Sequence, residues 1–509
     1  MSARDKRRWG LIALVALAVL LVAALAYARP GGGHSYSGGS RSSGSSSRSS
    51  SHSGGGGGGG GGGDGGVLFE LLIYLIIENP SVGIPLLILV GIVMVVRAAI
   101  QRGMKSWSTT TTNIENVGTT VRQGPQPRKE LEQLRQVDPE FSLVLFEDFV
   151  TMLYQAAHRA RALGTRPLAA YLEPSLAAAM QDAALADVQG IVIGALRYEG
   201  FSGMGSGTIH VELEVEANFV ELYRNGEQQR FYVRDRLVLS RSPTAKSRPF
   251  SRAHKLDCPN CGAPLEAMQG TQCSYCRQDV GYGRFDWMLQ QFSNIEREQR
   301  GPQLIGDSPE RGTDSPTIAD AQAPVRFQEL QQRDPSLNWQ TFTARIAHVY
   351  QELQVAWSTR DPLKIRPYVS DNQFQTLLYW IDMYVAQRCR NITEQARILR
   401  IDLANVTSDK HYDAITVRIF ATSTDYTISD DGKLLSGHKS RMRQYSEYWT
   451  WIRGTARRGP SRGDLACPNC GAQLRIGMAG TCEYCRVKVT AGEFDWVLSR
   501  IEQDDSYTG

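Results

Sequence analysis

Two copies of one cysteine module constrain this chain more than any other feature. Each copy has two Cys-x-x-Cys pairs separated by eleven residues and continues to a Phe-Asp-Trp triplet. The eight cysteines are Cys258, Cys261, Cys273 and Cys276 in the first copy and Cys467, Cys470, Cys482 and Cys485 in the second. A Cys-x-x-Cys pair forms a knuckle that points two thiolates inward, so two pairs supply four zinc ligands at roughly 2.3 Å each. The spacing therefore predicts two zinc ribbons and two bound zinc ions.

Both predicted zinc sites are interpreted as structural. Four cysteine ligands leave no open coordination position, and neither module places a His or Glu where a metal-bound water would need a general base. Two disulfide clusters are the alternative, but the knuckle spacing suits a metal better than a disulfide framework. Thiolates that stay reduced indicate a cytosol-like compartment. The ninth cysteine, Cys389, lies alone in a helical pattern and is interpreted as a small buried apolar residue.

The duplication extends beyond the cysteines in both directions. Matched positions include Asp138 and Asp334, Phe146 and Phe342, Tyr154 and Tyr350, Val280 and Val489, and Leu289 and Leu498. The matches upstream of the ribbons recur at spacings of three and four, which is the buried stripe of an amphipathic helix, with Asp-Pro at its start. We therefore expect each repeat to open with a helix, and each ribbon to form one unit with a short trailing helix.

Later in each repeat, apolar and polar side chains alternate at every second position instead of following the helical spacing. Further helix is expected over 373–390, and strands are expected at 208–223, 229–240, 396–404, 415–427 and 441–453. The hairpin signals Asn225-Gly226 and Asp431-Gly432 fall between strand candidates. Helices that precede the strands predict an α+β domain in each repeat, whose sheet packs on its helices along one face.

Two apolar segments separated by a Gly/Ser-rich stretch precede the repeats. The first segment, residues 9–26, follows a basic leader and ends in Ala26-Tyr27-Ala28, as a secretory signal peptide does. An uncleaved membrane anchor is the alternative. The Gly/Ser-rich stretch has almost no apolar side chains, and it is interpreted as a flexible linker rather than a phosphate-binding loop.

The second apolar segment, residues 67–100, is interpreted with its basic flank as a transmembrane region at 67–105. It is interrupted by Glu78-Asn79-Pro80, is uncharged from Ile84 to Val96, and then becomes basic, as cytoplasmic edges of membrane spans do. One crossing with an interfacial or tilted lead-in is favoured over a hairpin of two crossings. The repeats are therefore expected to face the cytoplasm.

The chain length suffices for two domains of ordinary size with small appendages. The expected plan is a signal-like or membrane segment at 1–28, a Gly/Ser-rich disordered linker at 29–66, the transmembrane region at 67–105, a linker at 106–129, a first α+β domain at 130–250, a first zinc ribbon plus helix at 251–299, a linker at 300–325, a second α+β domain at 326–460 and a second zinc ribbon plus helix at 461–509. The formal net charge of +4 is modest for 509 residues and does not favour nucleic-acid binding.

Three segments of the second repeat resemble a known family. They are 413–419, 425–427 and 447–453, and the last contains the distinctive Glu-Tyr-Trp-Thr sequence. They resemble the Tim44-like family, the C-terminal domain of the mitochondrial import-motor membrane anchor. That family also has bacterial members with a signal-like leader, a Gly/Ser-rich linker and a membrane segment. The first repeat keeps the alternation at 212–221 and 231–238 but lacks this signature.

The resemblance carries expectations for both fold and function. It implies two tandem cone-like domains of the nuclear-transport-factor-two type, in which a bent sheet wraps long helices around an apolar pocket. It also implies a membrane-tethered docking or assembly factor near protein translocation, at the bacterial inner membrane. The family domain usually occurs once and is not associated with a zinc ribbon, so the partners of the mitochondrial protein are not assumed here.

Two alternative functions rest on other side chains. A pocket that binds a lipid or small molecule, or an enzyme active site, would be indicated if His411, Asp413, Asp425 and Glu447 converged on it. His411 is more simply a solvated loop residue, and His158 and His348 are interpreted as surface or satisfied core groups. Contact with the ribosome or RNA would use ribbon arginines, namely Arg277, Arg284, Arg475 and Arg486.

The sequence as a whole favours a membrane-anchored, non-enzymatic scaffold or docking factor, associated with protein translocation or membrane-protein assembly. The tether, the duplication and the closed zinc sites support this interpretation, since tandem weak modules raise avidity through effective concentration. The expected partners are a membrane and other proteins. No catalytic residue is expected. Trp449 and Trp451, which share one face of a predicted strand, are interpreted as core, with a pocket lining as the alternative.

Overall fold

A computed structural model describes residues 117–122, 126–299, 310, 312–461 and 466–509, and all of them fall within one compact unit. The signal-like segment, the Gly/Ser-rich linker and the transmembrane region that the sequence predicts lie outside the described residues. No helix in the described part of the chain is long and apolar enough to span a membrane. Below, residues 126–299 are called the first half and residues 312–509 the second half.

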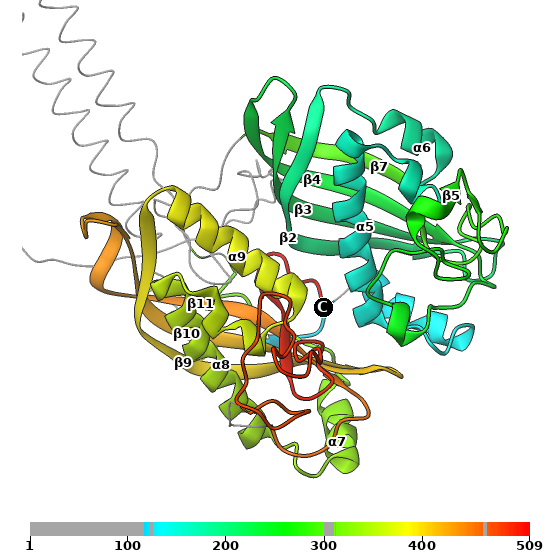
Figure 1. Cartoon of the computed structure of the whole chain (residues 1–509). Coiled ribbons are helices and arrows are strands. Elements are labelled where there is room, and N and C mark those ends of the chain that lie inside the picture. The colour runs from blue at the N-terminus through cyan, green and yellow to red at the C-terminus, as the bar shows by residue number, and fades with distance from the viewer. Residues whose placement is uncertain (1–116, 123–125, 300–309, 311, 462–465) are drawn as a thin grey trace, which may run out of the picture. The chain divides into compact units, whose positions relative to one another are not determined.

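The first half combines an antiparallel sheet with helices on one of its faces. Its main elements are α4 (Pro127–Glu130), α5 (Leu143–Leu163), α6 (Pro174–Ala179), β2 (Leu185–Ser202), β3 (Ile209–Tyr223), β4 (Gln228–Arg241) and β7 (Met288–Glu298). The short strands β5 (Met268–Gln269) and β6 (Gln272–Cys273) lie in the ribbon. The strand order is β2-β3-β4-β7, and α5 crosses one face of this sheet (Figure 1).

The second half has the same plan. Its elements are β8 (Thr317–Ile318), α7 (Ala323–Arg333), α8 (Trp339–Thr359), α9 (Asp371–Ala386), β9 (Cys389–Ser408), β10 (Tyr412–Ser429), β11 (Leu434–Gly454) and β12 (Val497–Gln503). The strand order is β12-β11-β10-β9, again antiparallel throughout. The mixed α and β composition and the five predicted strands are confirmed, although β2 was not predicted and the observed strands are mostly longer.

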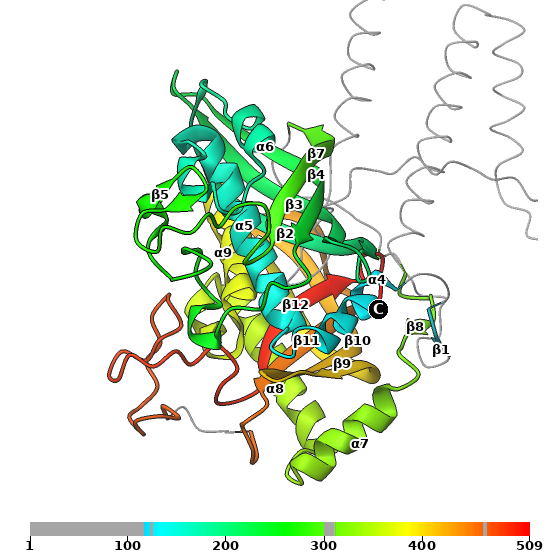
Figure 2. The ribbon, with the colours of Figure 1, turned by 90° about the vertical axis from the view of Figure 1, so that its right-hand side faces the viewer.

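The predicted trailing helices are wrong, because both segments are strands. After each ribbon the chain returns to its sheet, where β7 pairs with β4 and β12 pairs with β11 (Figure 2). Pairing satisfies backbone groups that the third strand would otherwise leave without partners along its outer edge. Each ribbon is therefore an insertion between the third and fourth strands of a sheet, rather than an appendage that follows a finished domain.

Both Asp-Pro pairs lie before the long helices rather than at their first residues, which corrects another expectation. Helix α5 follows the N-cap Ser142, whose hydroxyl accepts a hydrogen bond from Leu145 N. Helix α8 follows the N-cap Asn338, which forms a capping box with Thr341. Such caps satisfy N–H groups that the first helical turn leaves free and contribute about 1 kcal/mol each.

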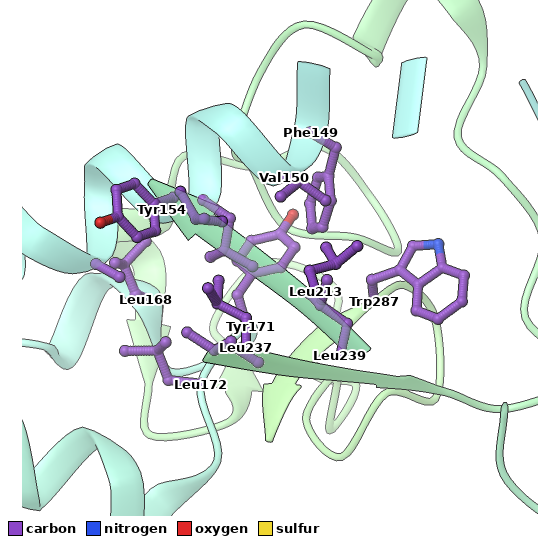
Figure 3. Close-up of a cluster of buried hydrophobic side chains, with 14 of the residues drawn as sticks. Phe149, Val150, Tyr154, Leu168, Tyr171, Leu172, Leu213, Leu237, Leu239 and Trp287 are labelled. Carbon is purple, nitrogen blue, oxygen red and sulfur yellow. The ribbon is translucent and has the colours of Figure 1, made fainter. Parts of the chain in front are cut away.

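Each half has a core between its helices and its sheet. Figure 3 shows part of the first core, in which side chains of α5 face side chains of β3 and β4. The labelled residues are Phe149, Val150, Tyr154, Leu168, Tyr171, Leu172, Leu213, Leu237, Leu239 and Trp287. In the second core, Trp449 and Trp451 are fully buried, which confirms their interpretation as core residues. Burial of such side chains stabilises the fold by about 1.5–3 kcal/mol each.

The predicted helix at 373–390 is shorter than expected. Helix α9 ends at Ala386, so Cys389 begins strand β9 instead of lying in a helix. Its burial is nevertheless as predicted, since none of its surface is exposed.

Part of the predicted linker at 300–325 is anchored to the second half. The buried Arg418 donates hydrogen bonds to Gly312 O at 2.8 Å and Ser315 O at 2.7 Å, and it pairs with Asp504 at 3.0 Å. Strand β8 also pairs in parallel with β1 (Thr119–Thr120). Because these backbone groups have fixed partners, residues 312–318 are part of the folded unit.

Candidate metal centres

Four cysteine sulfur atoms meet in each ribbon. In both clusters the four Sγ atoms all lie within 4.8 Å of one another. The Sγ atoms of Cys258 and Cys276 are 3.9 Å apart, and those of Cys467 and Cys485 are 3.7 Å apart. Four ligands placed tetrahedrally at ~2.3 Å from one ion are about 3.8 Å from each other. Each cluster could therefore hold one metal ion.

The disulfide alternative is wrong for this structure. All nine cysteines of the chain are free. A disulfide joins two sulfur atoms at about 2.05 Å, whereas the paired sulfurs of the ribbons lie almost twice as far apart. The sulfur positions suit ligands around a common centre.

The local backbone explains why these sequences bring the sulfurs together. The residue after each Cys-x-x-Cys pair has a positive φ: Gly262 (81°), Arg277 (59°), Gly471 (74°) and Arg486 (61°). In each case its N–H donates to the carbonyl of the first cysteine of the pair, closing a tight turn. Glycine adopts this conformation freely, but an arginine there costs about 1–2 kcal/mol. Metal binding, worth about 10–16 kcal/mol in zinc-finger peptides, is large enough to offset that cost.

An asparagine in each first knuckle supports one of the thiolates. The side chain of Asn260 hydrogen-bonds to Cys276 and lowers the pKa of that thiol to about 6. Asn469 does the same for Cys485, whose pKa is also lowered to about 6. A metal ligand must be a thiolate, so these amides favour the binding form near neutral pH.

The first ribbon is continuous with the core of the first half. Cys258, Cys273 and Val280 belong to the same buried apolar cluster as the sheet. At the entrance to the ribbon, Tyr171 Oη donates to the carbonyl of Asp257 at 2.5 Å, and Arg252 pairs with the Asp257 carboxylate at 2.8 Å. These contacts fix the first knuckle relative to the sheet.

The second ribbon has a small apolar cluster of its own and is attached by a buried arginine. The cluster contains Cys467, Cys482 and Val489. Arg366 donates from Nε to Met478 O at 2.9 Å within the ribbon, and it pairs with Asp371 at 2.5 Å. Because Arg366 is almost fully buried, its removal would take this donor from the Met478 carbonyl, while Asp371 would keep Lys488 and Thr490 as donors.

One buried arginine connects the ends of each half. Arg241 pairs with Asp138 at 2.9 Å, and its guanidinium lies 4.9 Å from the ring centroid of Trp287. The sequence reasoning noted the Asp-Pro and Phe-Asp-Trp motifs but missed Arg241, which lies at the end of β4. Asp138 and Asp334 recur at matched positions and a buried carboxylate needs a cation, but nothing in the sequence connects Asp138 with the distant Arg241.

The second half repeats this arrangement. Arg453 pairs with Asp334 at 2.9 Å and lies 4.6 Å from the ring centroid of Trp496. In both halves, therefore, an arginine at the end of the third strand joins the segment before the long helix to the segment that leaves the ribbon. The Asp of the Phe-Asp-Trp triplet accepts a hydrogen bond from the N–H of the following Trp, as Asp495 does for Trp496 at 2.7 Å.

The four residues that would mark the alternative pocket or active site do not converge. Asp413 and Asp425 are twelve residues apart on β10, which corresponds to roughly 40 Å along a strand. Asp413 accepts from Arg333 at 2.8 Å and Ser408 at 2.7 Å, so it is part of a local network. The convergence that the alternative pocket or active site would need is therefore not found for Asp413 and Asp425.

The remaining members of that set also have structural partners. Asp425 accepts from Asn391 at 2.7 Å, and Glu447 accepts from the Trp449 indole at 3.0 Å. His411 lies in the turn before β10, as expected, but it is mostly covered because it stacks on Phe250. These contacts describe core networks rather than an acid–base site.

The remaining candidate side chains are the exposed ribbon arginines and a histidine with a hydrogen-bonding partner. The four ribbon arginines that the sequence offered for RNA contact, Arg277, Arg284, Arg475 and Arg486, are all exposed. His348 Nε2 lies 3.2 Å from the Tyr368 hydroxyl, so it is a satisfied group as predicted.

One comparison with known proteins bears on the second half. The family model of the Tim44-like domain matches residues 325–461. This confirms the resemblance found in the second repeat. The matched residues include most of α7, all of α8 and α9 and the first three strands of the sheet, and they end before the second ribbon. A search of curated proteins finds no match to the chain.

Proposed function

We propose that this chain is a membrane-anchored, non-enzymatic scaffold that docks other proteins near a protein-translocation or membrane-assembly site. The observation that carries the proposal is the Tim44-like match at residues 325–461, since that family suggests a translocation-associated scaffold. The packing of the second half supports it, because the acidic residues there are held in buried networks and the tryptophans of β11 fill the core.

We further infer that the two halves are copies of one cone-like domain. The same strand order and the same Arg–Asp–Trp contact recur in both halves. Register shifts in β2, β9 and β10 support a strongly bent sheet, since an extra residue in one strand increases local bending and twist. A duplicated docking domain on one chain would gain avidity for a partner with two binding sites.

Zinc is the ion that we assign to both cysteine clusters. Four thiolates around one centre select a soft or borderline metal, and tetrahedral sulfur ligation is typical of structural zinc. All four positions are taken by protein ligands, so the ion has a structural role. It would fix the connection between the third and fourth strands of each sheet.

The location of the protein is part of the same proposal. We assign the anchor to residues 67–105 and place the folded halves on the cytoplasmic side of a bacterial inner membrane, where thiolates stay reduced. An epitope tag in the Gly/Ser-rich stretch and another at the C-terminus test this orientation in spheroplasts. Added protease should remove the first tag and spare the second; loss of the C-terminal tag would overturn the assignment.

Crosslinking in membranes tests the docking function directly. The full chain should give covalent adducts with other proteins, identified by mass spectrometry. The matched truncation removes residues 312–509 as one piece, because β12 follows the second ribbon and completes the second sheet. Adducts that disappear with this truncation support docking through the second half. If the full chain gives no protein adduct beyond those of an unrelated membrane protein, the scaffold proposal fails.

A further inference from the structure

The second knuckle of each ribbon exposes a tyrosine and an arginine. The first knuckle reads Cys-Pro-Asn-Cys-Gly in both copies, and the second reads Cys-x-Tyr-Cys-Arg in both. Tyr275 is 73 % exposed and Tyr484 is 57 % exposed. Arg277 and Arg486 are exposed as well. We call each pair, Tyr275 with Arg277 and Tyr484 with Arg486, the tip of its ribbon.

Side chains of the first knuckle serve the ribbon itself, whereas those of the tip do not. Asn260 and Asn469 hydrogen-bond to cysteines of their clusters. Within the described residues, neither tip tyrosine has a hydrogen bond or a ring contact for its side chain, and neither tip arginine has an ion pair. The tip side chains therefore make no polar or aromatic contact with the ribbon that carries them.

The tip arginines occupy a backbone conformation that glycine adopts more easily. Their φ values are 59° and 61°, and the matching residues of the first knuckles are Gly262 at 81° and Gly471 at 74°. A side chain at such a φ crowds the backbone, and retained strain of this kind clusters at functional sites. The first knuckles form the same turn with glycine, so the ribbon fold does not require an arginine there.

Hydrogen bonds within the ribbon hold the backbone of each tip. Arg277 N donates to Cys273 O at 2.8 Å, and Arg486 N donates to Cys482 O at 2.9 Å. In the first ribbon, Gln272 Nε2 also donates to Arg277 O at 3.1 Å. Each tyrosine and arginine are thus presented, two residues apart, from a fixed turn. A fixed turn lowers the entropy that a partner must overcome on binding.

The charge of the ribbons favours a protein over a nucleic acid as the partner. Residues 258–287 contain two basic and three acidic side chains, and residues 467–496 contain three of each, so the net charges are −1 and 0. A nucleic acid would need a basic surface with several charges. A single free guanidinium beside an aromatic ring instead fits one carboxylate with an apolar side chain next to it. Tyrosine and arginine are also enriched among the residues that dominate binding at protein interfaces.

We propose that each tip is a contact site for an acidic segment of another protein. The guanidinium pairs with an Asp or Glu of the partner, and the tyrosine ring covers an apolar side chain beside it. Two tips on one chain raise the avidity for a partner with two acidic segments. This inference rests on the docking function proposed above, and it adds the surface and the partner chemistry. Both tips lie outside the residues matched by the Tim44-like family.

Photocrosslinking from the tips of the full chain in membranes tests the proposal. The probe is p-benzoylphenylalanine, placed at position 275 or 484 in separate chains. Position 282 is the control, because Tyr282 is 54 % exposed in the first ribbon but the neighbouring Arg284 already pairs with Asp279 at 3.2 Å. Adducts are treated with RNase, and crosslinked peptides are sequenced by mass spectrometry. Both tip positions should give RNase-resistant adducts with protein, at peptides that contain Asp or Glu.

Glycine variants separate recognition from a structural role. R277G and R486G introduce the residue that the first knuckles use, so the ribbons should keep their protection from hydrogen exchange. The crosslinking yield from the tyrosine position of the same tip should nevertheless fall about tenfold, whereas adducts from position 282 should not change.

Three results would overturn the proposal. They are a fall of less than about threefold in R277G and R486G, adducts that RNase removes, and crosslinked peptides without acidic residues. Protein adducts formed elsewhere on the chain would still support docking, so the two proposals fail separately.

Discussion

Replacing Arg453 by Met should destabilise the second half specifically. The guanidinium lies 2.9 Å from Asp334, and the two side chains are only 3 % and 4 % exposed. Removing one partner of a buried ion pair costs about 3–5 kcal/mol, because the other charge stays buried without compensation. Asp334 keeps hydrogen bonds from Ser336 Oγ at 2.6 Å and Gly459 N at 3.2 Å, so we expect the lower end, about 3 kcal/mol.

Native-state hydrogen exchange of the full chain, read by peptide, measures this effect in each half separately. A loss of about 3 kcal/mol corresponds to roughly 100-fold faster exchange through opening. The faster exchange should appear in peptides of α8, β11 and β12, and the exchange of peptides from β3 and β4 should not change. R241M provides the mirror-image control, since Arg241 makes the same contact in the first half. The exposed R458M variant should change exchange little.

A change in exchange of less than about fivefold in the second half of R453M would show that the Arg453–Asp334 pair does not stabilise that half as expected. Equal effects of R453M and R241M on both halves would show that each ion pair does not act within its own half.

Three further predictions use other parts of the fold. Burial lowers the pKa of His158, and Asp235 opposes this shift. Below about pH 6.5, His158 therefore binds a proton in the unfolded chain while it stays neutral in the folded chain. Stability should therefore fall with pH below that value more steeply in wild type than in H158Q, measured by thermal unfolding; parallel profiles would contradict this. An ideal Cβ at Gly437 would lie 2.2 Å from Asp425 O, whereas one at Gly432 meets nothing within 4 Å, although both residues have positive φ. G432A should cost about 1 kcal/mol and G437A clearly more in urea unfolding, and equal costs would refute the clash. In C470S the amides of the second ribbon should exchange faster, while those of the first ribbon stay protected. Unchanged protection of the second ribbon would show that the ribbons fold without metal.

The two four-cysteine clusters were predictable from the sequence because each depends on residues close together in the chain. Four cysteines at fixed spacing determine a knuckle by backbone geometry that depends on a few neighbouring residues, such as Gly262 and Gly471. The hairpins at Asn225-Gly226 and Asp431-Gly432 were predictable for the same reason, since Gly226 and Gly432 have the positive φ that such turns need.

The strands that follow the ribbons were not predictable from their own residues. Strand β7 has an irregular pattern of buried and exposed positions, because it lies at the edge of the sheet, where it pairs with β4 and otherwise makes an isolated bridge from Leu289 to Leu172. Its strand conformation depends on a partner edge that is distant in the sequence, and tertiary pairing overrides weak local preference. The same distance explains why Arg241 and Arg453 were missed, since each contacts an Asp more than a hundred residues away.

The surroundings of His158 could not be predicted for a related reason. His158 was interpreted as a surface or satisfied core group, since an isolated histidine on a helix gives no signal. In the structure it is 2 % exposed and lies 3.4 Å from Asp235 of β4, which in turn accepts a hydrogen bond from Asn294 of β7. Where a strand is taken for a helix, the groups it contributes to such a network cannot be placed.

The metal content of the purified full chain tests the central claim most directly. Elemental analysis of protein prepared without added metal or chelator, combined with intact mass spectrometry under non-denaturing conditions, gives the number and identity of bound ions. The account predicts two zinc ions per chain, held by the eight ribbon cysteines as thiolates. A chain without bound metal, or one whose ribbon cysteines are joined in disulfides, would contradict it.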